Sequence, residues 1–400
     1  MHGLRPCMIP SLNKGKIHMK KVTVLGAGMV GSAIARDLSP QYAVTAADSS
    51  GERLERLKSQ AVLETCKADL SRPESVRRVV AGSDLVIGAL PGFMGFEALK
   101  SVIEAGKNIV DISFFGENPF LLDAAALKNG VTAVVDFGVA PGMSNAILGH
   151  WNGRMAVQSF ECMVGGLPVE RTWPFQYKAP FSPSDVLEEY TRPARLLENG
   201  RVVTRPALSE PELAEFDGIG TLEAFNTDGL RTLIETMNIP FMKEKTLRYP
   251  GHIEAIRILK ESGFLDSSEI QIGEARLRPI DVTSKLLFRK WKLGEAEDEF
   301  TVMRIVLRGR QENTLKEITY FLLDRYNAET GVSSMARTTG YACTAAARLI
   351  LDGKFDRKGI IPPERIGEDP RCFDRIMKDL ADRGVNYRME ERVHEKDVEG

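Results

Sequence analysis

Short apolar runs alternate with amphipathic stretches through the first third of the chain. The apolar runs have the composition of strands and lie at residues 20–25, 42–47, 63–66, 85–89, 108–110 and 131–135. Stretches with helical character separate most of them, at residues 52–60, 73–81, 96–105 and 119–128. Because alternating strands and helices form parallel sheets covered on both faces, we predict a doubly wound α/β sheet of six parallel strands.

The pattern changes after Gly142. Strand-like runs at 157–165 and in parts of 285–307 are joined by long segments rich in Pro, Gly and Arg, which predicts a second, α+β domain. Small and apolar residues at 335–351 predict a closely packed helix that returns to the first domain. We therefore divide the chain as an extension (1–18), a first domain (19–142, completed by 335–384), a second domain (143–334) and a charged tail (385–400) that we expect to be frayed.

Composition narrows the function. The 400 residues fit two domains, and 53 Lys and Arg against 55 Asp and Glu leave no basic field for nucleic acid or an anionic membrane. Since no apolar run has the length of a membrane span and no apolar stretch follows the basic residues of the first eighteen, we expect a cytoplasmic protein. Five widely spaced cysteines, none in a C-x-x-C pair, predict reduced thiols and no metal site.

A glycine motif joins the first strand to the first helix. It reads Gly26-Ala27-Gly28-Met29-Val30-Gly31. In such a motif Gly26 permits a tight turn, Gly28 lets the backbone approach a pyrophosphate, and Gly31 lets the helix pack on the strand. Met29 and Val30 open the helix, whose N-terminal N–H groups face the phosphates. Turn glycines of an ordinary sheet are the alternative, but the strand-turn-helix context favours a Rossmann-type dinucleotide site.

Asp48 ends the second strand, seventeen positions after Gly31. A carboxylate there accepts hydrogen bonds from the ribose 2′-OH and repels a 2′-phosphate, so it favours NAD over NADP. Arg53 would weaken that preference. The cofactor is therefore predicted to be NAD.

Further cofactor contacts are expected where other strands end. Ligands of such sheets lie beyond the carboxyl ends of the strands. On this ground we assign to the cofactor Asp69, Leu70, Leu90, Pro91, Gly92 and Gly142. For Asp69 an ordinary turn role is equally compatible with the sequence.

A series of ordered motifs then carries a family resemblance. They occupy residues 88–92, 110–113, 136–142, 165–168, 181–183, 189–195, 227–231 and 246–252. Over residues 20–365 the chain resembles the saccharopine dehydrogenase family. Around Arg192, Arg231 and Arg248 it is most similar to the branch that contains L-lysine 6-dehydrogenase.

The resemblance implies an activity. It implies a Rossmann domain, a second domain with a mixed sheet for substrate and dimer contacts, and oxidation at a carbon that bears nitrogen. In that branch the reaction is NAD-dependent oxidative deamination of L-lysine at the ε-carbon, in lysine degradation. Ammonia is released, and the product, 2-aminoadipate 6-semialdehyde, cyclises to piperideine-6-carboxylate. A homodimer or a dimer-based oligomer is expected.

This reaction requires a base. An amine must be neutral before the adjacent carbon loses hydride, and with a pKa of about 10.4 its neutralisation near pH 7.4 costs about 4 kcal/mol. Asp111 and Asp136, which end the fifth and sixth strands, and His252, in a turn, are the candidate bases. For Asp111 and Asp136 a non-catalytic role is equally compatible with the sequence, which for Asp136 means fixing its loop. For His252 a structural role in its turn is the favoured interpretation.

The α-carboxylate of an amino acid requires a fork of donors, which arginine supplies. Arg192, Arg231 and Arg248 are the candidates, and Tyr177 is a candidate for the wall along the aliphatic chain. A surface role for each arginine and a core role for the aromatic ring are the alternatives. We interpret Ser182 and Asp185 as the cap and the closing residue of a helical capping box.

Two other functions remain compatible with the sequence. One is saccharopine dehydrogenase forming L-glutamate, whose substrate has three carboxylates and therefore needs more cationic groups in its pocket than lysine does. The other is a non-catalytic sensor that binds NAD. The polar motifs of the second domain favour an enzyme over a sensor, because NAD binding alone does not require them.

Overall fold

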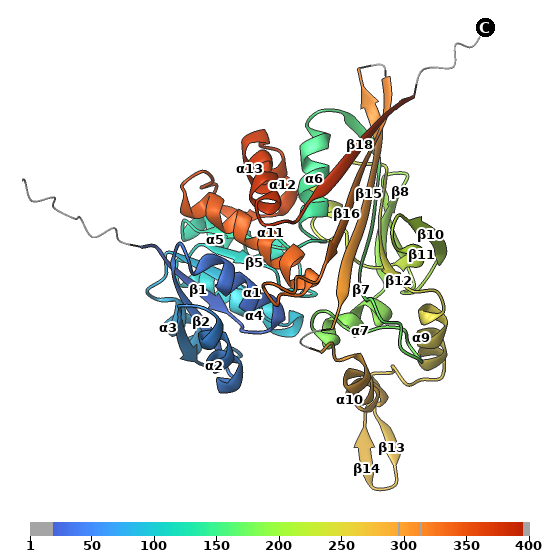
Figure 1. The fold of residues 1–400 in the computed structure, drawn as a ribbon, viewed down its shortest axis with the longest axis horizontal. Helices are drawn as coiled ribbons and strands as arrows, with labels where there is room; N and C mark the ends of the chain where they lie inside the picture. Colours follow the sequence, from blue (N-terminus) through green and yellow to red (C-terminus); the bar gives the residue numbers. More distant parts are fainter. Residues whose placement is uncertain (1–18, 295–296, 313, 395–400) are drawn as a thin grey trace, which may run out of the picture.

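A seven-stranded parallel sheet forms the centre of the first domain in the computed structural model, which describes residues 19–294, 297–312 and 314–394 (Figure 1). Its order is β17-β6-β5-β4-β1-β2-β3, so the order in which strands are added to the sheet reverses between β1 and β4. The strands are β1 (Lys21–Leu25), β2 (Ala43–Asp48), β3 (Glu64–Lys67), β4 (Leu85–Gly88), β5 (Ile109–Asp111), β6 (Thr132–Val134) and β17 (Gly359–Ile361). The doubly wound α/β fold is confirmed, with a seventh strand from the C-terminal part of the chain.

Helices cover both faces of this sheet. They are α1 (Met29–Leu38), α2 (Gly51–Gln60), α3 (Pro73–Val80), α4 (Gly92–Glu104), η1 (Pro119–Leu122) and α5 (Asp123–Lys128), and α6 (Met143–Asn152) follows β6. The first turn of α4 was not predicted, and it begins at Gly92. A Cβ on this residue would lie 2.4 Å from the carbonyl oxygen of Phe114. The glycine therefore serves close packing of α4 on the chain after β5.

The C-terminal helices return to the first domain, as the sequence predicts for residues 335–351. Helix α11 (Ser334–Leu351) packs on α1, where a Cβ on Gly340 would lie 3.2 Å from the side chain of Ile34. Helices α12 (Pro363–Gly367) and α13 (Pro370–Ala381) follow. Small residues in α11 thus permit the close contact with α1.

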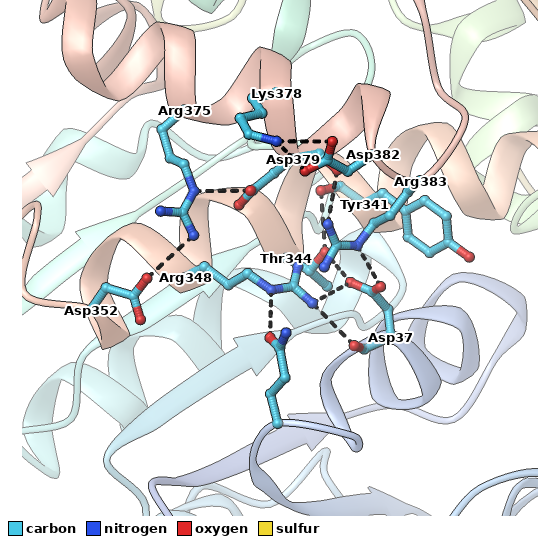
Figure 2. A network of polar contacts seen from close by, with 11 residues as sticks. Asp37, Tyr341, Thr344, Arg348, Asp352, Arg375, Lys378, Asp379, Asp382 and Arg383 are labelled. Carbon is cyan, nitrogen blue, oxygen red and sulfur yellow. Dashed lines mark hydrogen bonds and ion pairs between the residues drawn. The ribbon is translucent and has the colours of Figure 1, made fainter.

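A network of polar contacts holds the C-terminal helices against the first domain (Figure 2). The carboxylate of Asp37, on α1, accepts hydrogen bonds from Thr344 at 2.6 Å, from Arg348 at 2.9 Å and from Arg383 at 2.6 Å. Because Asp37 is separated from these partners by more than three hundred residues, the network ties the two ends of the chain into one domain.

The second domain is built on a nine-stranded mixed sheet. Its main path is β10-β11-β12-β7-β15-β16-β18; β8 pairs with β12 and with β9. The strands are β7 (Ala156–Pro168), β8 (Ala194–Glu198), β9 (Arg201–Arg205), β10 (Glu212–Phe216), β11 (Gly220–Asn226), β12 (Phe241–Arg248), β15 (Glu299–Gln311), β16 (Thr314–Arg325) and β18 (Tyr387–His394). Helices α7 (Pro183–Thr191), α8 (Leu233–Thr236), α9 (His252–Glu261) and α10 (Pro279–Trp291) accompany it, and a hairpin of β13 (Ile270–Ile272) and β14 (Ala275–Leu277) extends beside α10 (Figure 1).

The prediction of strand within parts of 285–307 is confirmed by β15 from Glu299 onward, while residues 285–291 belong to helix α10. The prediction for the tail is wrong in part. The start of the charged tail is not frayed, because residues 387–394 form β18 and pair with β16 from Tyr387 opposite Leu322 to His394 opposite Leu315. At a sheet edge the backbone ladder supplies stability even when most side chains are charged and exposed. Residues 395–400 of the predicted tail and the extension 1–18 lie outside the described residues.

The structure also bears on the thiols, metals and membranes. Cys66, Cys162, Cys343 and Cys372 are free thiols, and Cys7 lies outside the described residues. Among the residues described, no group of three or more His, Cys, Asp and Glu side chains is placed to hold a metal ion. No helix in the described ranges has the length and apolar character needed to cross a membrane.

Candidate active site

A cavity of about 1210 Å³ lies between the two domains. Its wall on the first domain comes from the carboxyl ends of β1, β2, β4 and β6. This edge includes the position between β1 and β4, where the strand order reverses. Its wall on the second domain comes from β7, β12 and α7, and the first turn of α11 closes one side. This is the position at which open α/β sheets bind their ligands.

The three motif glycines meet different surroundings. Gly26 has φ +103°, and a Cβ there would lie 2.3 Å from the carbonyl oxygen of Ala89. A Cβ on Gly31 would lie 2.1 Å from the carbonyl oxygen of Gly26. A Cβ on Gly28 would meet no heavy atom within 4 Å, although Gly28, Met29 and Val30 all line the cavity. The backbone therefore requires Gly26 and Gly31, whereas Gly28 leaves open space in which a pyrophosphate fits.

The carboxylate of Asp48 is fixed at the end of β2. One oxygen accepts a hydrogen bond from the backbone N–H of Ala27 at 2.8 Å, and the other accepts one from that of Ser50 at 2.7 Å. The half-exposed guanidinium of Arg53 lies 3.7 Å away. Both groups line the cavity, so the carboxylate that favours NAD and a cation that favours a 2′-phosphate lie side by side.

The other candidate cofactor residues divide into two groups. Leu90 and Pro91 line the cavity, but Gly92 and Gly142 do not. Gly142 has φ +137°, and a Cβ there would lie 1.9 Å from the carbonyl oxygen of Gly138. Its observed role is to permit the tight turn before α6.

Asp69 and Leu70 also lie away from the cavity wall. The Asp69 carboxylate accepts hydrogen bonds from the backbone N–H of Ser71 at 3.1 Å and from its hydroxyl at 2.6 Å, and it forms an ion pair with Arg72 at 3.1 Å. Leu70 is 5% exposed and belongs to the core. The contacts of Asp69 are those of a turn, the alternative that the sequence left open.

Asp111 is buried behind the cavity wall and does not line it. Its carboxyl group accepts hydrogen bonds from the backbone N–H of Ser113 at 2.8 Å and from its hydroxyl at 3.2 Å, and it lies against Gly88, where a Cβ would be 1.8 Å from Oδ2. Burial raises the pKa of Asp111 to about 8. These contacts fix the turn after β5.

Asp136 and Arg231 form a buried ion pair between the domains. Two hydrogen bonds of 3.1 Å join the guanidinium to the carboxylate, which lines the cavity. Arg231 also donates to the carbonyl oxygen of Phe115 and lies over the ring of Phe114 at 4.9 Å. Since Arg231 does not line the cavity and its donors are engaged, its contacts are structural and give no sign of a substrate carboxylate.

Arg248 reaches the cavity from β12, but its donors are also engaged. Its guanidinium donates to Glu189 at 2.5 Å and to the hydroxyl of Tyr190 at 3.1 Å, and it lies 4.3 Å from the ring centre of Tyr177. Tyr177 is 2% exposed and does not line the cavity. Its position is that of a core aromatic, packed against Trp291.

His252 lies in the same buried cluster. Its Nε2 is 2.9 Å from the hydroxyl of Tyr190, and its Nδ1 is 2.8 Å from the carbonyl oxygen of Phe175. Burial, followed by the charge of Arg248, lowers the pKa of His252 to about 3. The ring is thus neutral near pH 7 and away from the cavity wall, which favours the structural alternative.

Arg192 differs from the other two arginines. It lines the cavity from the end of α7, pairs with Glu188 at 3.1 Å and lies 5.0 Å from the ring centre of Phe114. Its buried Nη1 has no hydrogen-bond partner among the described residues. Of the three predicted arginines, Arg192 retains a donor for a carboxylate.

Several carboxyl groups that the sequence did not reveal as site residues also line the cavity, and two of them are the buried Glu244 and the partly buried Asp185. Glu244, Thr246 and Arg248 alternate along β12 on the face toward the cavity. Glu244 is 4% exposed, and its Oε2 has no hydrogen-bond partner in the described part of the chain. The predicted motif began at Thr246, and period-two alternation, applied two residues upstream, would have found Glu244.

The second of these groups is Asp185, on α7. The capping box predicted for it is wrong, since Ser182 makes no side-chain cap hydrogen bond and an oxygen of Asp185 accepts the backbone N–H of Gly92 at 3.4 Å. This contact joins the second domain to the start of α4 in the first. Burial raises the pKa of Asp185 to about 6.

Comparisons with known proteins agree with this architecture. A family model described as the saccharopine dehydrogenase NADP binding domain matches residues 22–134, and one described as the saccharopine dehydrogenase C-terminal domain matches residues 138–385. The apo structure of saccharopine dehydrogenase (L-Glu forming) from Saccharomyces cerevisiae matches with a TM-score of 0.75 and 20% identity, covering 94% of this chain and all of that one.

Curated relatives are distant in sequence. The mitochondrial alpha-aminoadipic semialdehyde synthase of Rattus norvegicus is 22% identical, over 86% of this chain and 45% of its own length. The chain thus spans about half the length of that relative. The NADP(+)-dependent, L-glutamate-forming saccharopine dehydrogenase of Schizosaccharomyces pombe is 24% identical, over 81% of this chain and 87% of its own.

Proposed function

The chain belongs to the saccharopine dehydrogenase family, and from this premise we propose that it is an NAD-dependent enzyme that oxidatively deaminates L-lysine at its ε-carbon. The products are ammonia and 2-aminoadipate 6-semialdehyde, which closes to a cyclic imine. The charge balance of the cavity is the observation that carries this proposal.

Carboxylates outnumber cations on the substrate side of the cavity. The acidic residues of this wall are Asp136, Asp185, Glu188, Glu189, Asp228 and Glu244, and the basic ones are Arg192, Arg248 and Lys292. Four of these carboxylates are paired with arginines: Glu189 with Arg248, Glu188 with Arg192, Asp136 with Arg231 and Asp228 with Arg195. Within the described chain, Asp185 and Glu244 are the two carboxyl groups of this wall without an arginine partner, against Lys292. An acidic wall attracts a substrate with two amines and one carboxylate better than one with three carboxylates. The charge balance therefore favours lysine over saccharopine.

The residues present suit a dinucleotide and an amino acid together. Gly28 leaves room for the pyrophosphate, and Asp48 lies where a ribose hydroxyl would donate. Bound NAD supplies the acceptor for the hydride that leaves the ε-carbon. We expect Arg192, which lines the cavity and whose Nη1 has no hydrogen-bond partner among the described residues, to bind the α-carboxylate, and the acidic wall to bind the ε-amine.

The proposal is tested by the formation of NADH. Purified protein with NAD and L-lysine is expected to produce NADH, with kcat/KM rising from neutral to alkaline pH as the free amine and an essential base become available. Norleucine, which lacks the ε-amine, is the control and is expected to give no NADH. Turnover of saccharopine together with no lysine-dependent NADH at any pH would overturn the assignment in favour of the L-glutamate-forming reaction.

The names of the relatives support that second candidate, since the matched dehydrogenases of yeasts form L-glutamate. The third hypothesis, a sensor that binds NAD without turnover, is separated by titrating NADH fluorescence with and without lysine. A sensor would bind NADH and oxidise neither substrate.

We also propose a homodimer. The β13–β14 hairpin is a sheet of two strands, which is marginal on its own. Ile270 and Ile272 are 44% and 58% exposed on one face of it, and Leu277 pairs with Ile270 on that face. Light scattering is expected to give twice the mass of one chain, and a single-chain mass would contradict the proposal.

A further inference from the structure

Glu244 is held in a confined position on the cavity wall. It lies on β12 between two residues of the opposite face, Lys243 and Lys245, and its carboxyl group lies against the backbone of Gly229. A Cβ on Gly229 would be 1.7 Å from Oε1. With Oε1 against this glycine, Oε2 is the oxygen that has no partner among the described residues. The absence of a side chain at residue 229 therefore makes the space that Glu244 occupies.

Glu244 forms no ion pair with a cation of the described ranges. The charged and titratable groups that influence it are Glu189 on α7, Asp228 and Arg231 after β11, Asp136 after β6, and Cys162 on β7. The one cation of this set, Arg231, is bound through two hydrogen bonds to Asp136. Glu189 is paired with Arg248, and Asp228 with Arg195.

Burying a carboxylate without a cation costs free energy. Such a carboxylate in a site usually binds a ligand or a proton. Burial, followed by the charge of Glu189, raises the pKa of Glu244 to about 8. A carboxyl group with this pKa is largely protonated at neutral pH, and as a carboxylate at higher pH it accepts a proton from an ammonium group more readily than an exposed carboxylate does. Glu244 lines the cavity between the two domains, so a substrate bound there lies next to it.

We propose that Glu244 binds the ε-ammonium group of the substrate and accepts its proton, so that the amine is neutral when the ε-carbon loses hydride. In this step an N–H bond breaks and an O–H bond forms on the carboxylate, which leaves a neutral amine and a carboxylic acid. The two electrons of the C–H bond then leave with the hydride to NAD, the nitrogen lone pair forms the C=N bond of an iminium, and water hydrolyses the iminium to the aldehyde and ammonia. The inference rests on the proposed function for its substrate and adds the base.

The other carboxyl groups of the site are less suited to this role. Asp136 is committed to Arg231, and Asp111 does not line the cavity. Asp185 accepts a hydrogen bond from the N–H of Gly92 across the domain boundary. Of these four residues, Glu244 is the one that lines the cavity and has a buried oxygen without a hydrogen-bond partner in the described chain.

Ligand affinity tests the inference without turnover. The NADH-loaded protein is titrated with L-lysine and with L-norleucine by calorimetry. The native protein is expected to bind lysine roughly tenfold to a hundredfold more tightly than norleucine, the effect of one hydrogen bond to a charged group. Glu244→Gln, which keeps the shape, is expected to lower the affinity for lysine to that for norleucine and to leave the affinity for norleucine unchanged.

Two further variants separate the role of Glu244 from a loss of fold. Gly229→Ala displaces the carboxyl group by the close approach given above and is expected to lower the preference for lysine as Glu244→Gln does. Glu212→Gln is the matched control, because Glu212 pairs with Lys245, the next residue of β12, and does not line the cavity. It is expected to keep the native preference.

The kinetic readout distinguishes a base from a binding contact. Glu244→Gln is expected to lower kcat with lysine by roughly a hundredfold or more and to change the pH profile of kcat, as loss of a general base does. Equal affinity of the native protein for lysine and norleucine, or an unchanged preference in both Glu244→Gln and Gly229→Ala, would overturn the inference. A preference for lysine that depends on Glu244, without any NADH formed, would instead overturn the proposed reaction and leave this binding role intact.

Discussion

The two walls of the cavity differ in the groups that they present to a ligand. On the cofactor side recognition is built from the backbone, with Gly26 and Gly31 enforcing a tight turn and Asp48 held by two backbone N–H groups. On the substrate side it is built from side chains, with the buried pairs of Asp136 and Arg231 and of Glu189 and Arg248. A pyrophosphate requires close approach of the chain, whereas an amino acid requires charges, and buried charges must be paired.

The comparison predicts that the largest effects come from breaking pairs on the substrate side. Arg231→Ala leaves the Asp136 carboxylate buried without its cation, because the pair is 3% and 1% exposed. We expect the free energy of unfolding to fall by about 3–5 kcal/mol, measured by urea denaturation. Arg278→Ala, which breaks an exposed pair with Asp281, is the control and should cost less than about 1 kcal/mol. Equal losses of unfolding free energy in both variants would show that burial does not increase the contribution of the Asp136–Arg231 pair to stability.

Alanine substitutions in the glycine loop test the cofactor side. Gly31→Ala forces α1 away from the loop and is expected to cost about 1–3 kcal/mol of unfolding free energy together with NADH affinity. Gly28→Ala meets no neighbouring atom, so it is expected to leave the fold stable and to lower NADH affinity by about tenfold or more. Thermal unfolding and NADH fluorescence titrations measure the two effects. If Gly28→Ala binds NADH normally, the pyrophosphate does not lie against this residue.

The pH dependence of protein stability tests the partly buried position of Asp185 at the boundary between the two domains. Its pKa is about 6 in the folded protein against an ordinary value of 3.8, so the folded state favours the protonated form. Ionisation therefore costs stability, and this cost appears as the pH rises from 4 through 6. Asp185→Asn is expected to stabilise the protein by about 1–2 kcal/mol at pH 8 and to have no effect near pH 4. A difference from the native protein that does not vary between these two pH values would contradict the assignment.

The smallest expected effect concerns the choice of cofactor. Asp48 favours NAD, while the neighbouring Arg53 opposes that preference. Asp48→Ser is expected to lower the ratio of kcat/KM for NAD to that for NADP by about tenfold, or roughly 1.4 kcal/mol. Steady-state rates with both cofactors measure it. A native enzyme that is faster with NADP would refute the prediction.

The local sequence pattern determined those structural features that depend on residues close together in the chain. The strands and helices of the first domain, the glycine loop and helix α11 follow from the spacing of apolar and small residues, because backbone hydrogen bonds and buried faces repeat with a fixed period. Asp48 followed from its position at the end of a strand. The change of pattern after Gly142 located the second domain, although it did not reveal the pairing of its strands.

Only the tertiary structure decided the partners of the charged residues. Arg231 and Asp136 are 95 positions apart, and nothing in either local sequence indicates that they neutralise each other. In the same way β18 is stabilised by the edge of β16, and β17 by that of β6, although the tail appears frayed and the first sheet appears complete when the sequence is considered alone. Glu244 becomes a candidate base only because folding removes it from water and leaves its Oε2 without a partner among the described residues. Local sequence sets which face a side chain occupies, but the free energy of a buried charge depends on everything that the fold brings around it.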